Sequence, residues 1–289
     1  MSTRRQGSVF LLTDYGGADE FAGVVRAVVA RHAPGAPIVD LSHDVPPFDV
    51  RAGALALERA APYLGHGIVL AVVDPGVGSA RRGVAVTRGA KDGPSHFVGP
   101  DNGLLPWALD ALGGAVRAVE LTSGANVAAT DWANDAGRAP KTFDGRDLFA
   151  PVAAQLWCGA APATVGTPIE VDSLVRLARP HLLVAPGTVE AEVQWIDRFG
   201  NAQLAARPDH IRAAGLSRTL DTVIGSAVHR MEMVAAFAEL ATDAPGLVAD
   251  ANGHLALVVN RGSAADLLDV HVGDVVVLRP GMASTVSRP

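Results

Sequence analysis

Three short apolar runs, each ending in an aspartate beside a glycine-rich turn, most constrain what this chain can fold into. They are Val9 to Leu12 before Asp14, Ile68 to Val73 before Asp74, and Phe97-Val98 before Asp101. Amphipathic stretches separate the runs, and this alternation is typical of a mainly parallel sheet flanked by helices. Ligands of open α/β sheets bind beyond the carboxyl ends of the strands, so we expect Asp14, Asp74 and Asp101 to converge on one pocket.

Three further aspartates precede apolar stretches with helical spacing and are predicted to cap helices. Asp19 precedes an apolar face that begins at Phe21 and stops near Pro34, and Asp49 precedes a face that contains Ala54 and Leu57. Asp147 precedes a third apolar stretch, from Leu148 to Trp157.

The pattern changes beyond about Leu177, where proline and glycine interrupt the chain before Thr188 to Ile196 alternates at period two. Such alternation is typical of an antiparallel strand, and Leu255 to Val259 and Val270 to Leu278 are predicted to be further strands. We therefore expect an α/β domain over residues 1–178 and a small antiparallel, barrel-like β domain over residues 187–289. Met231 to Thr242 fits either a helix or a loop with one short strand.

Composition restricts the class of protein. The 289 residues are 49% hydrophobic and 19% charged, enough for two packed domains, and the net charge of -6 argues against a nucleic-acid partner. A single cysteine excludes an internal disulfide framework, and neither a signal peptide nor an apolar run of about 18 residues is present. These features predict a cytoplasmic protein with no membrane span.

The side chains near the three runs suggest how a ligand is held. The carboxylate of Asp14 suits a ribose, because it accepts hydrogen bonds from two neighbouring hydroxyls, and Arg81 or Arg82 can fold back onto Asp74 and keep it ionised. Each aspartate also has a plainer reading as a turn residue that bonds its own backbone, and the two arginines as surface residues. The segment Thr142 to Asp147 can likewise be only a capping turn.

The sequence gives little support for a catalytic metal site or for a Ser-His-Asp triad. The nine histidines show no HExxH spacing, so we expect no catalytic transition metal, while a hard cation held by the aspartates stays a weaker alternative. The glycine-rich turns match no dinucleotide or P-loop fingerprint, and no nucleophile elbow of a Ser-His-Asp triad is present.

Taken in order, the motifs resemble those of the SAM hydroxide adenosyltransferases, or S-adenosyl-L-methionine (SAM) hydrolases, which are related to fluorinases and chlorinases. The segments that carry the resemblance are Leu12 to Gly16 with Asp19, Asp40 to His43, Val72 to Gly78 with Arg81-Arg82, Gly99 to Gly103 with Asp101 and Asn102, Gly145 to Pro151, Ile196 to Asn201 and, more loosely, Val259 to Gly262.

The resemblance implies a seven-stranded α/β domain, a barrel-like second domain, and a homotrimer with SAM bound between one subunit's first domain and its neighbour's second. It implies that Asp14 binds the ribose hydroxyls and Asp19 the methionine end, with Asp101 and Asn102 also near the substrate. Residues contributed across the interface would be Asp197, Phe199 and Asn201, with Asn260 and Arg261 standing where the family usually has Asn-Ser. SAM is then the substrate, and no cofactor is expected.

The resemblance also implies a catalytic set of Asp74, Arg81 and the residue at position 144, which orient a water for attack on the ribose C5′. The family has a histidine in this last place, whereas this chain has Asp144, which can accept a hydrogen bond but cannot donate one while ionised.

Two rival functions remain open at this point. A non-catalytic SAM or adenosine binder would keep the pocket without activating water. A SAM-dependent halogenase is disfavoured because the stretch from Gly83 to His96 is short and Asp101 would add a negative charge that repels a halide.

Overall fold

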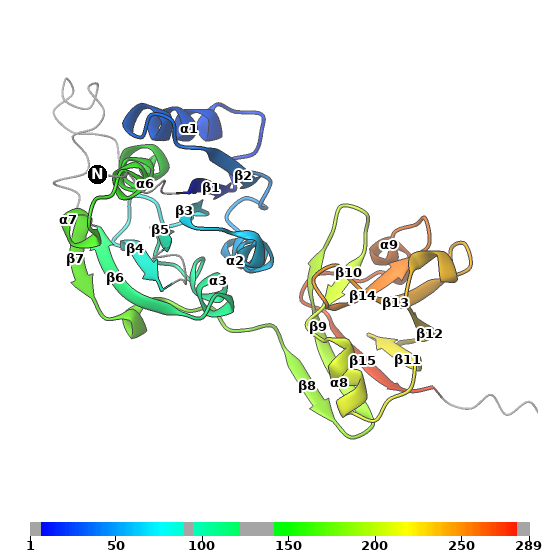
Figure 1. The fold of residues 1–289 in the computed structure, drawn as a ribbon. Coiled ribbons are helices and arrows are strands. Elements are labelled where there is room, and N and C mark those ends of the chain that lie inside the picture. The colour runs from blue at the N-terminus through cyan, green and yellow to red at the C-terminus, as the bar shows by residue number, and fades with distance from the viewer. Residues whose placement is uncertain (1–6, 90–94, 122–141, 282–289) are drawn as a thin grey trace, which may run out of the picture. The chain divides into compact units, whose positions relative to one another are not determined.

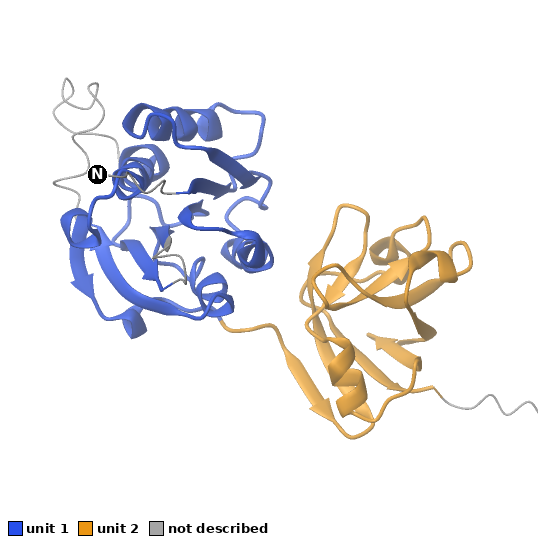
Figure 2. Cartoon of the chain, in the orientation of Figure 1, with its two compact units in different colours: residues 1–177 blue, residues 178–289 orange. Residues whose placement is uncertain are grey.

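The chain folds into two compact units, residues 1–177 and residues 178–289 (Figure 2). The computed structural model describes residues 7–89, 95–121 and 142–281. It has the predicted α/β unit followed by a barrel-like β unit. In the described parts of the chain, no helix is both long and apolar enough to cross a membrane.

Unit 1 contains a seven-stranded sheet with the order β2-β1-β3-β5-β4-β6-β7. The first four strands in this order run parallel, whereas β4, β6 and β7 are added antiparallel, so the sheet is mixed. Its strands are β1 (Ser8–Thr13), β2 (Ile38–Ser42), β3 (Gly67–Val72), β4 (Gly83–Arg88), β5 (Ser95–Pro100), β6 (Ala115–Leu121) and β7 (Gly166–Ile169).

Helices cover both faces of this sheet (Figure 1). One pair, α1 and α6, shares a core with β1, β3 and β5, and the other pair, α2 and α3, packs together through Ala54, Leu55 and Trp107. The helices of unit 1 are α1 (Phe21–His32), α2 (Val50–Ala60), α3 (Pro106–Ala111), α6 (Ala150–Trp157) and α7 (Pro162–Val165), with a π-helical turn η3 (Gly145–Phe149) and short 3-10 turns η1 (Ala61–Tyr63) and η4 (Val171–Ser173).

One of the three predicted helix caps is confirmed and two are wrong. Asp49 has a non-helical backbone (φ -84°, ψ 85°), and its side chain accepts a hydrogen bond from Ala52 N, as a capping residue does. Asp19 lies one residue too early, because the residue before α1 is Glu20 in a helical conformation and no side chain caps the helix. Asp147 is not a cap either, since it lies inside the π-helical turn, buried and paired with Arg146.

Unit 2 is a closed ring of seven strands in the order β10-β14-β13-β12-β11-β15-β9, with β9 pairing back onto β10 and β8 added outside β9. All pairs are antiparallel except β12 with β13. The elements are β8 (Leu182–Ala185), β9 (Thr188–Ile196), β10 (Ala202–Leu204), α8 (Pro208–Ala213), β11 (Thr219–Ile224), β12 (Ala227–Val234), η5 (Phe237–Glu239), β13 (Pro245–Ala249), β14 (Leu255–Val259), α9 (Ala264–Leu268) and β15 (Val275–Pro280).

The strand predictions for this unit are largely confirmed. The segments predicted at β9 and β14 have the expected bounds, whereas Gly273-Asp274 forms a turn before β15, so this strand starts only at Val275. The ambiguous segment from Met231 is the end of strand β12 followed by the short turn η5.

Candidate active site

The site of unit 1 lies where the order of the parallel strands reverses. From β1 the chain passes through α1 to β2 on one side, and then through α2 to β3 on the other side of β1. Where two neighbouring strands are followed by connections on opposite faces of the sheet, a crevice forms at their carboxyl ends. This crevice is the usual ligand site of an open α/β sheet. Asp14 directly follows β1 and Asp74 lies two residues after β3, so both carboxylates lie at this crevice.

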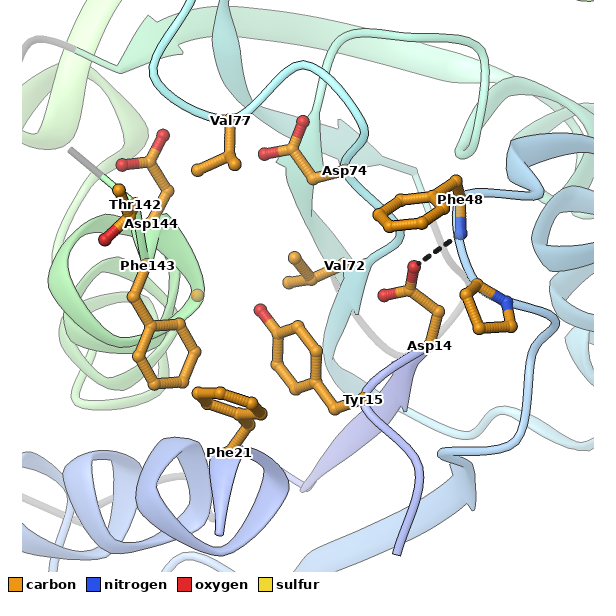
Figure 3. A pocket seen from close by; sticks show the side chains of 12 residues that line it. Asp14, Tyr15, Phe21, Phe48, Val72, Asp74, Val77, Thr142, Phe143 and Asp144 are labelled. Atoms are coloured by element: carbon orange, nitrogen blue, oxygen red, sulfur yellow. Dashed lines mark hydrogen bonds between the residues drawn. The ribbon is translucent and has the colours of Figure 1, made fainter. Parts of the chain in front are cut away.

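A cavity of about 270 Å³ occupies the crevice. Figure 3 shows Asp74 and Asp144 on the side of the β3 turn and η3, Asp14 by the turn at Phe48, and aromatic rings on the side of α1. The residues that line it are Asp14, Tyr15, Phe21, Pro47, Phe48, Val72, Asp74, Val77, Thr142, Phe143, Asp144 and Gly145.

Arg81 connects two of these carboxylates. Its Nε donates to Asp74 Oδ1 at 2.9 Å and its Nη2 donates to Asp74 Oδ2, so the pair is bidentate. The same Nη2 also donates to Asp144 Oδ2 at 2.5 Å. The sequence hypothesis that Arg81 folds back onto Asp74 agrees with this geometry, and the bridge holds two acceptors at one wall of the cavity.

The turn after Asp74 allows this return. Gly78 adopts a φ of 77°, a conformation that glycine reaches without strain, and Ser79 N bonds back to the carbonyl of Gly76. The guanidinium of Arg81 then lies over the ring of Phe149, 5.2 Å from its centroid. Burial acts to lower the pKa of Arg81, but the hydrogen bonds and charges of Asp74 and Asp144 outweigh burial and raise it, so Arg81 stays a fixed cation.

Asp14 is held by the neighbouring turn. Its Oδ2 accepts a hydrogen bond from Phe48 N at 2.9 Å, with Phe48 in a left-handed conformation (φ 67°). The motif Asp40 to His43 holds the residues on either side of Asp14. Thr13 and His43 share a 2.8 Å hydrogen bond, and Gly16 N donates to the carbonyl of His43. These contacts fix the Asp14 carboxylate at the edge of the cavity.

Aromatic side chains form the remaining wall, and motif reasoning missed them. Phe143 packs edge to face against Tyr15 and Phe21, and these two are tilted against each other, with centroid separations of 5.2 to 6.0 Å. Burial, followed by the charges of Asp14, Asp74 and Asp144, raises the pKa of Tyr15 well above its ordinary value. Two of the three rings adjoin aspartates already selected, Tyr15 after Asp14 and Phe143 before Asp144, and this adjacency was the available signal.

The rest of the segment from Thr142 to Asp147 is internally paired. Arg146 donates to both oxygens of Asp147, at 2.7 and 2.8 Å, and lies over the ring of Phe143 at 5.1 Å. Of the two carboxylates in this segment, only Asp144 therefore faces Arg81.

The expected convergence of three aspartates needs correction, because Asp101 does not line the cavity. Its carboxylate, 3% exposed, accepts from Arg82 Nε at 2.9 Å and from Val175 N at 2.9 Å. Its neighbour Asn102 bonds the carbonyl of Val73 and the amide of Leu104, which braces the turn that carries Asp74. Asp101 thus contributes no charge to the cavity wall. The negative charge that would repel a halide there comes instead from Asp74 and Asp144.

Asp19 is exposed in the loop between Asp14 and α1 and is not one of the lining residues. The binding role that the resemblance implies for Asp19 remains a prediction, as it does for Asp101 and Asn102.

The candidate residues of unit 2 gather on two loops. Asp197 accepts hydrogen bonds from Phe199 N, Asn201 N and Asn201 Nδ2, which forms a tight turn on which Phe199 is 70% exposed. Gly200 in this turn lies directly against Ser263. A Cβ atom on Gly200 would be 2.1 Å from the serine hydroxyl oxygen, so only glycine fits here.

The second loop contains Asn260, whose amide donates to the carbonyl of Leu240 at 2.9 Å, and Arg261, which has a φ of 65°. The tie from Ala265 N to the carbonyl of Gly200 keeps the two loops adjacent. Unit 2 therefore presents Phe199 and Arg261 from neighbouring loops.

The site offers little for a metal ion. Over the ranges that the structure describes, no three His, Cys, Asp or Glu side chains are grouped as a metal would require. Two of the three cavity carboxylates already share Arg81, whose guanidinium offsets part of their charge.

Comparison with known proteins identifies the family. The model of the SAM hydroxide adenosyltransferase N-terminal domain matches residues 9–166, and that of the C-terminal domain matches residues 191–277. The chain therefore belongs to the SAM hydroxide adenosyltransferase family.

Relatives match over nearly the whole chain. The (R)-S-adenosyl-L-methionine hydrolase of Salinispora arenicola is 46% identical over 93% of this chain and 96% of its own length, and that of Thermus thermophilus is 40% identical over 92% and 96%. Fluorinases are more distant, with that of Actinoplanes sp. at 24% identity over 93% of this chain and 96% of the relative. A crystal structure of a conserved protein from Thermotoga maritima has a TM-score of 0.83 at 29% identity, covering 94% of this chain and 99% of that one.

Proposed function

We propose that this chain is an enzyme that hydrolyses SAM to adenosine and L-methionine. The observation that carries the proposal is the wall formed by Asp74, Arg81 and Asp144, which presents two bridged acceptors beside a cavity that also contains the Asp14 carboxylate. The relatives named as (R)-S-adenosyl-L-methionine hydrolases support the same substrate and make the (R) epimer the first to test.

In the proposed reaction, a water attacks the ribose C5′. A carbon-oxygen bond forms, the bond from C5′ to the sulfonium breaks, and its electrons neutralise the sulfur as methionine leaves. The proton released by the water passes to Asp74, whose position Arg81 fixes. Because the sulfonium is already a good leaving group, positioning of the water supplies most of the acceleration, and general-base help adds about 10² to 10⁴-fold.

Charge and shape suit the rest of the substrate. Asp14 would accept from the ribose hydroxyls with the oxygen that Phe48 N leaves open. Three carboxylates against one guanidinium leave an excess of negative charge, and aromatic rings adjoin it, which together favour a sulfonium cation over a neutral thioether. The reaction needs no cofactor, since SAM itself is the substrate.

We further propose a homotrimer in which unit 2 of a neighbouring subunit completes the site with Asp197, Phe199, Asn201, Asn260 and Arg261. The exposed ring of Phe199 on its tight turn and the adjacent Arg261 supply an apolar contact and a cation for the adenine and the methionine carboxylate. The cytoplasmic location expected from the sequence stays a prediction.

The deciding experiment incubates purified protein with SAM, with and without chloride or fluoride, and separates adenosine, methionine and 5′-halo-adenosine by chromatography. We expect adenosine and methionine in equal amounts, independent of halide. A halogenated product would instead assign the chain to the halogenases. A rise in melting temperature with adenosine or SAM, but no methionine release, would favour the non-catalytic binder.

A further inference from the structure

The hydroxyl of Tyr15 is the feature of the cavity that the catalytic set does not use. The ring packs against Phe21 and Phe143, which holds it at the cavity wall (Figure 3). The hydroxyl makes no hydrogen bond with any residue that the structure describes, although Tyr15 lines the cavity. A phenol hydroxyl in such a place usually finds a partner, and since none of the described residues supplies one, a ligand or water in the cavity is the natural candidate.

Tyr15 is also positioned tightly against the residue that follows Asp144. A Cβ atom built on Gly145 would lie 2.2 Å from the Tyr15 oxygen, so the hydroxyl rests directly on the Gly145 backbone. The ring is therefore held between its two aromatic neighbours and the turn at Gly145, the residue that follows Asp144.

The cavity is otherwise short of hydrogen-bond donors. Its three aspartates only accept while ionised, and of the lining side chains only Tyr15 and Thr142 carry a donor. Thr142 is exposed, whereas the Tyr15 ring is partly buried beside the carboxylates. The raised pKa of Tyr15 keeps the proton on the oxygen, so the group acts as a donor rather than as an anion.

We propose that the Tyr15 hydroxyl donates a hydrogen bond to the attacking water. This inference rests on the proposed hydrolysis. The water then donates one proton to Asp74 and the other to Asp144, accepts from Tyr15 with one lone pair, and points its remaining lone pair at C5′. Tyr15 thereby fixes the orientation of the water, which could still rotate if only the two carboxylates held it.

Tyr15→Phe tests the proposal, because it keeps the ring and removes only the donor. We expect kcat to fall about 2- to 13-fold, the change that corresponds at 25 °C to the loss of one hydrogen bond of about 0.5 to 1.5 kcal/mol, with KM changed less than twofold. Tyr63→Phe is the matched control, since Tyr63 is the other tyrosine of the chain, is 78% exposed and does not line the cavity. Its kcat should equal that of the unaltered protein.

The same substitution made in an Asp144→Asn variant distinguishes a hydrogen-bond donor role of Tyr15 from a packing role. Asp144→Asn offers the cavity an amide donor, so Tyr15→Phe should lower kcat less in this background than in the unaltered protein. Equal losses in both backgrounds, an unchanged kcat in Tyr15→Phe, or an effect confined to KM would each overturn the Tyr15 proposal. If the unaltered protein releases no adenosine, the proposed function itself fails, and that result is distinct from these.

Discussion

At the scale of single residues, one guanidinium organises the site. Arg81 uses two nitrogens on Asp74 and shares one of them with Asp144, so neither carboxylate can turn into the cavity independently. Where the resemblance implies a histidine, Asp144 keeps the contact with Arg81 but offers no donor while ionised, and the role proposed for Tyr15 would supply one.

Asp74→Asn tests the proton acceptor. The amide keeps the size of the side chain but is a far weaker base, so kcat should fall about 10² to 10⁴-fold while the dissociation constant for SAM changes only a few-fold. Single-turnover kinetics and calorimetric titration measure the two quantities. Equal losses in both would make Asp74 a binding residue only.

The pKa of Tyr15 can be measured directly, because the chain has two tyrosines. In Tyr63→Phe protein, the phenolate absorbance near 295 nm should rise only well above pH 10, since burial and the nearby carboxylates disfavour the anion. The folded chain holds this proton more tightly than the unfolded chain, so this contribution to stability is intact below about pH 10 and is lost as the pH rises further. Titration at or below pH 10 would contradict the geometry.

At the scale of elements, the sequence predicted those features that depend on local pattern. Strand β9 follows from alternation, strand β14 from a short apolar run, and the cap at Asp49 from an aspartate before a helix. Asp19 and Asp147 show the same local pattern, yet α1 starts after Glu20 and the turn at Asp147 is π-helical. Likewise, only the fold reveals that Asp101 faces Arg82 and Val175 rather than the cavity, because those partners come from distant segments.

The contact between the β1 loop and η3 predicts a compensating pair of substitutions. Gly145→Ala should lower the melting temperature and kcat, because the new methyl group overlaps the Tyr15 oxygen. Adding Tyr15→Phe removes that oxygen and leaves the next contact at 3.2 Å, so the double variant should regain most of the lost stability. Thermal unfolding of the four proteins decides this, and additive losses would mean that the overlap is not the cause.

At the scale of the whole molecule, the proposed interfacial site predicts complementation. Asp74→Asn impairs unit 1 and Asp197→Ala impairs the loop that presents Phe199, so each variant alone should be nearly inactive. Mixed by co-expression, the two would form trimers in which some sites receive an intact unit 1 from one subunit and an intact unit 2 from another. Activity should then reappear. No recovery in mixed trimers that are shown to assemble would place the whole site within one subunit.

The hydrogen bond from Val175 N to the buried Asp101 carboxylate indicates where the packed part of unit 1 ends. The family model of the N-terminal domain stops at residue 166, but the buried Asp101 carboxylate depends on Val175 N, and Leu177 packs on α2 and α3. A chain cut at residue 166 would leave the buried Asp101 carboxylate without the hydrogen bond from Val175 N. It would also expose the apolar surface of α2 and α3 that Leu177 covers. The last segment before unit 2 therefore serves as the closing piece of unit 1, and any division or fusion of the two units has to be made beyond Leu177.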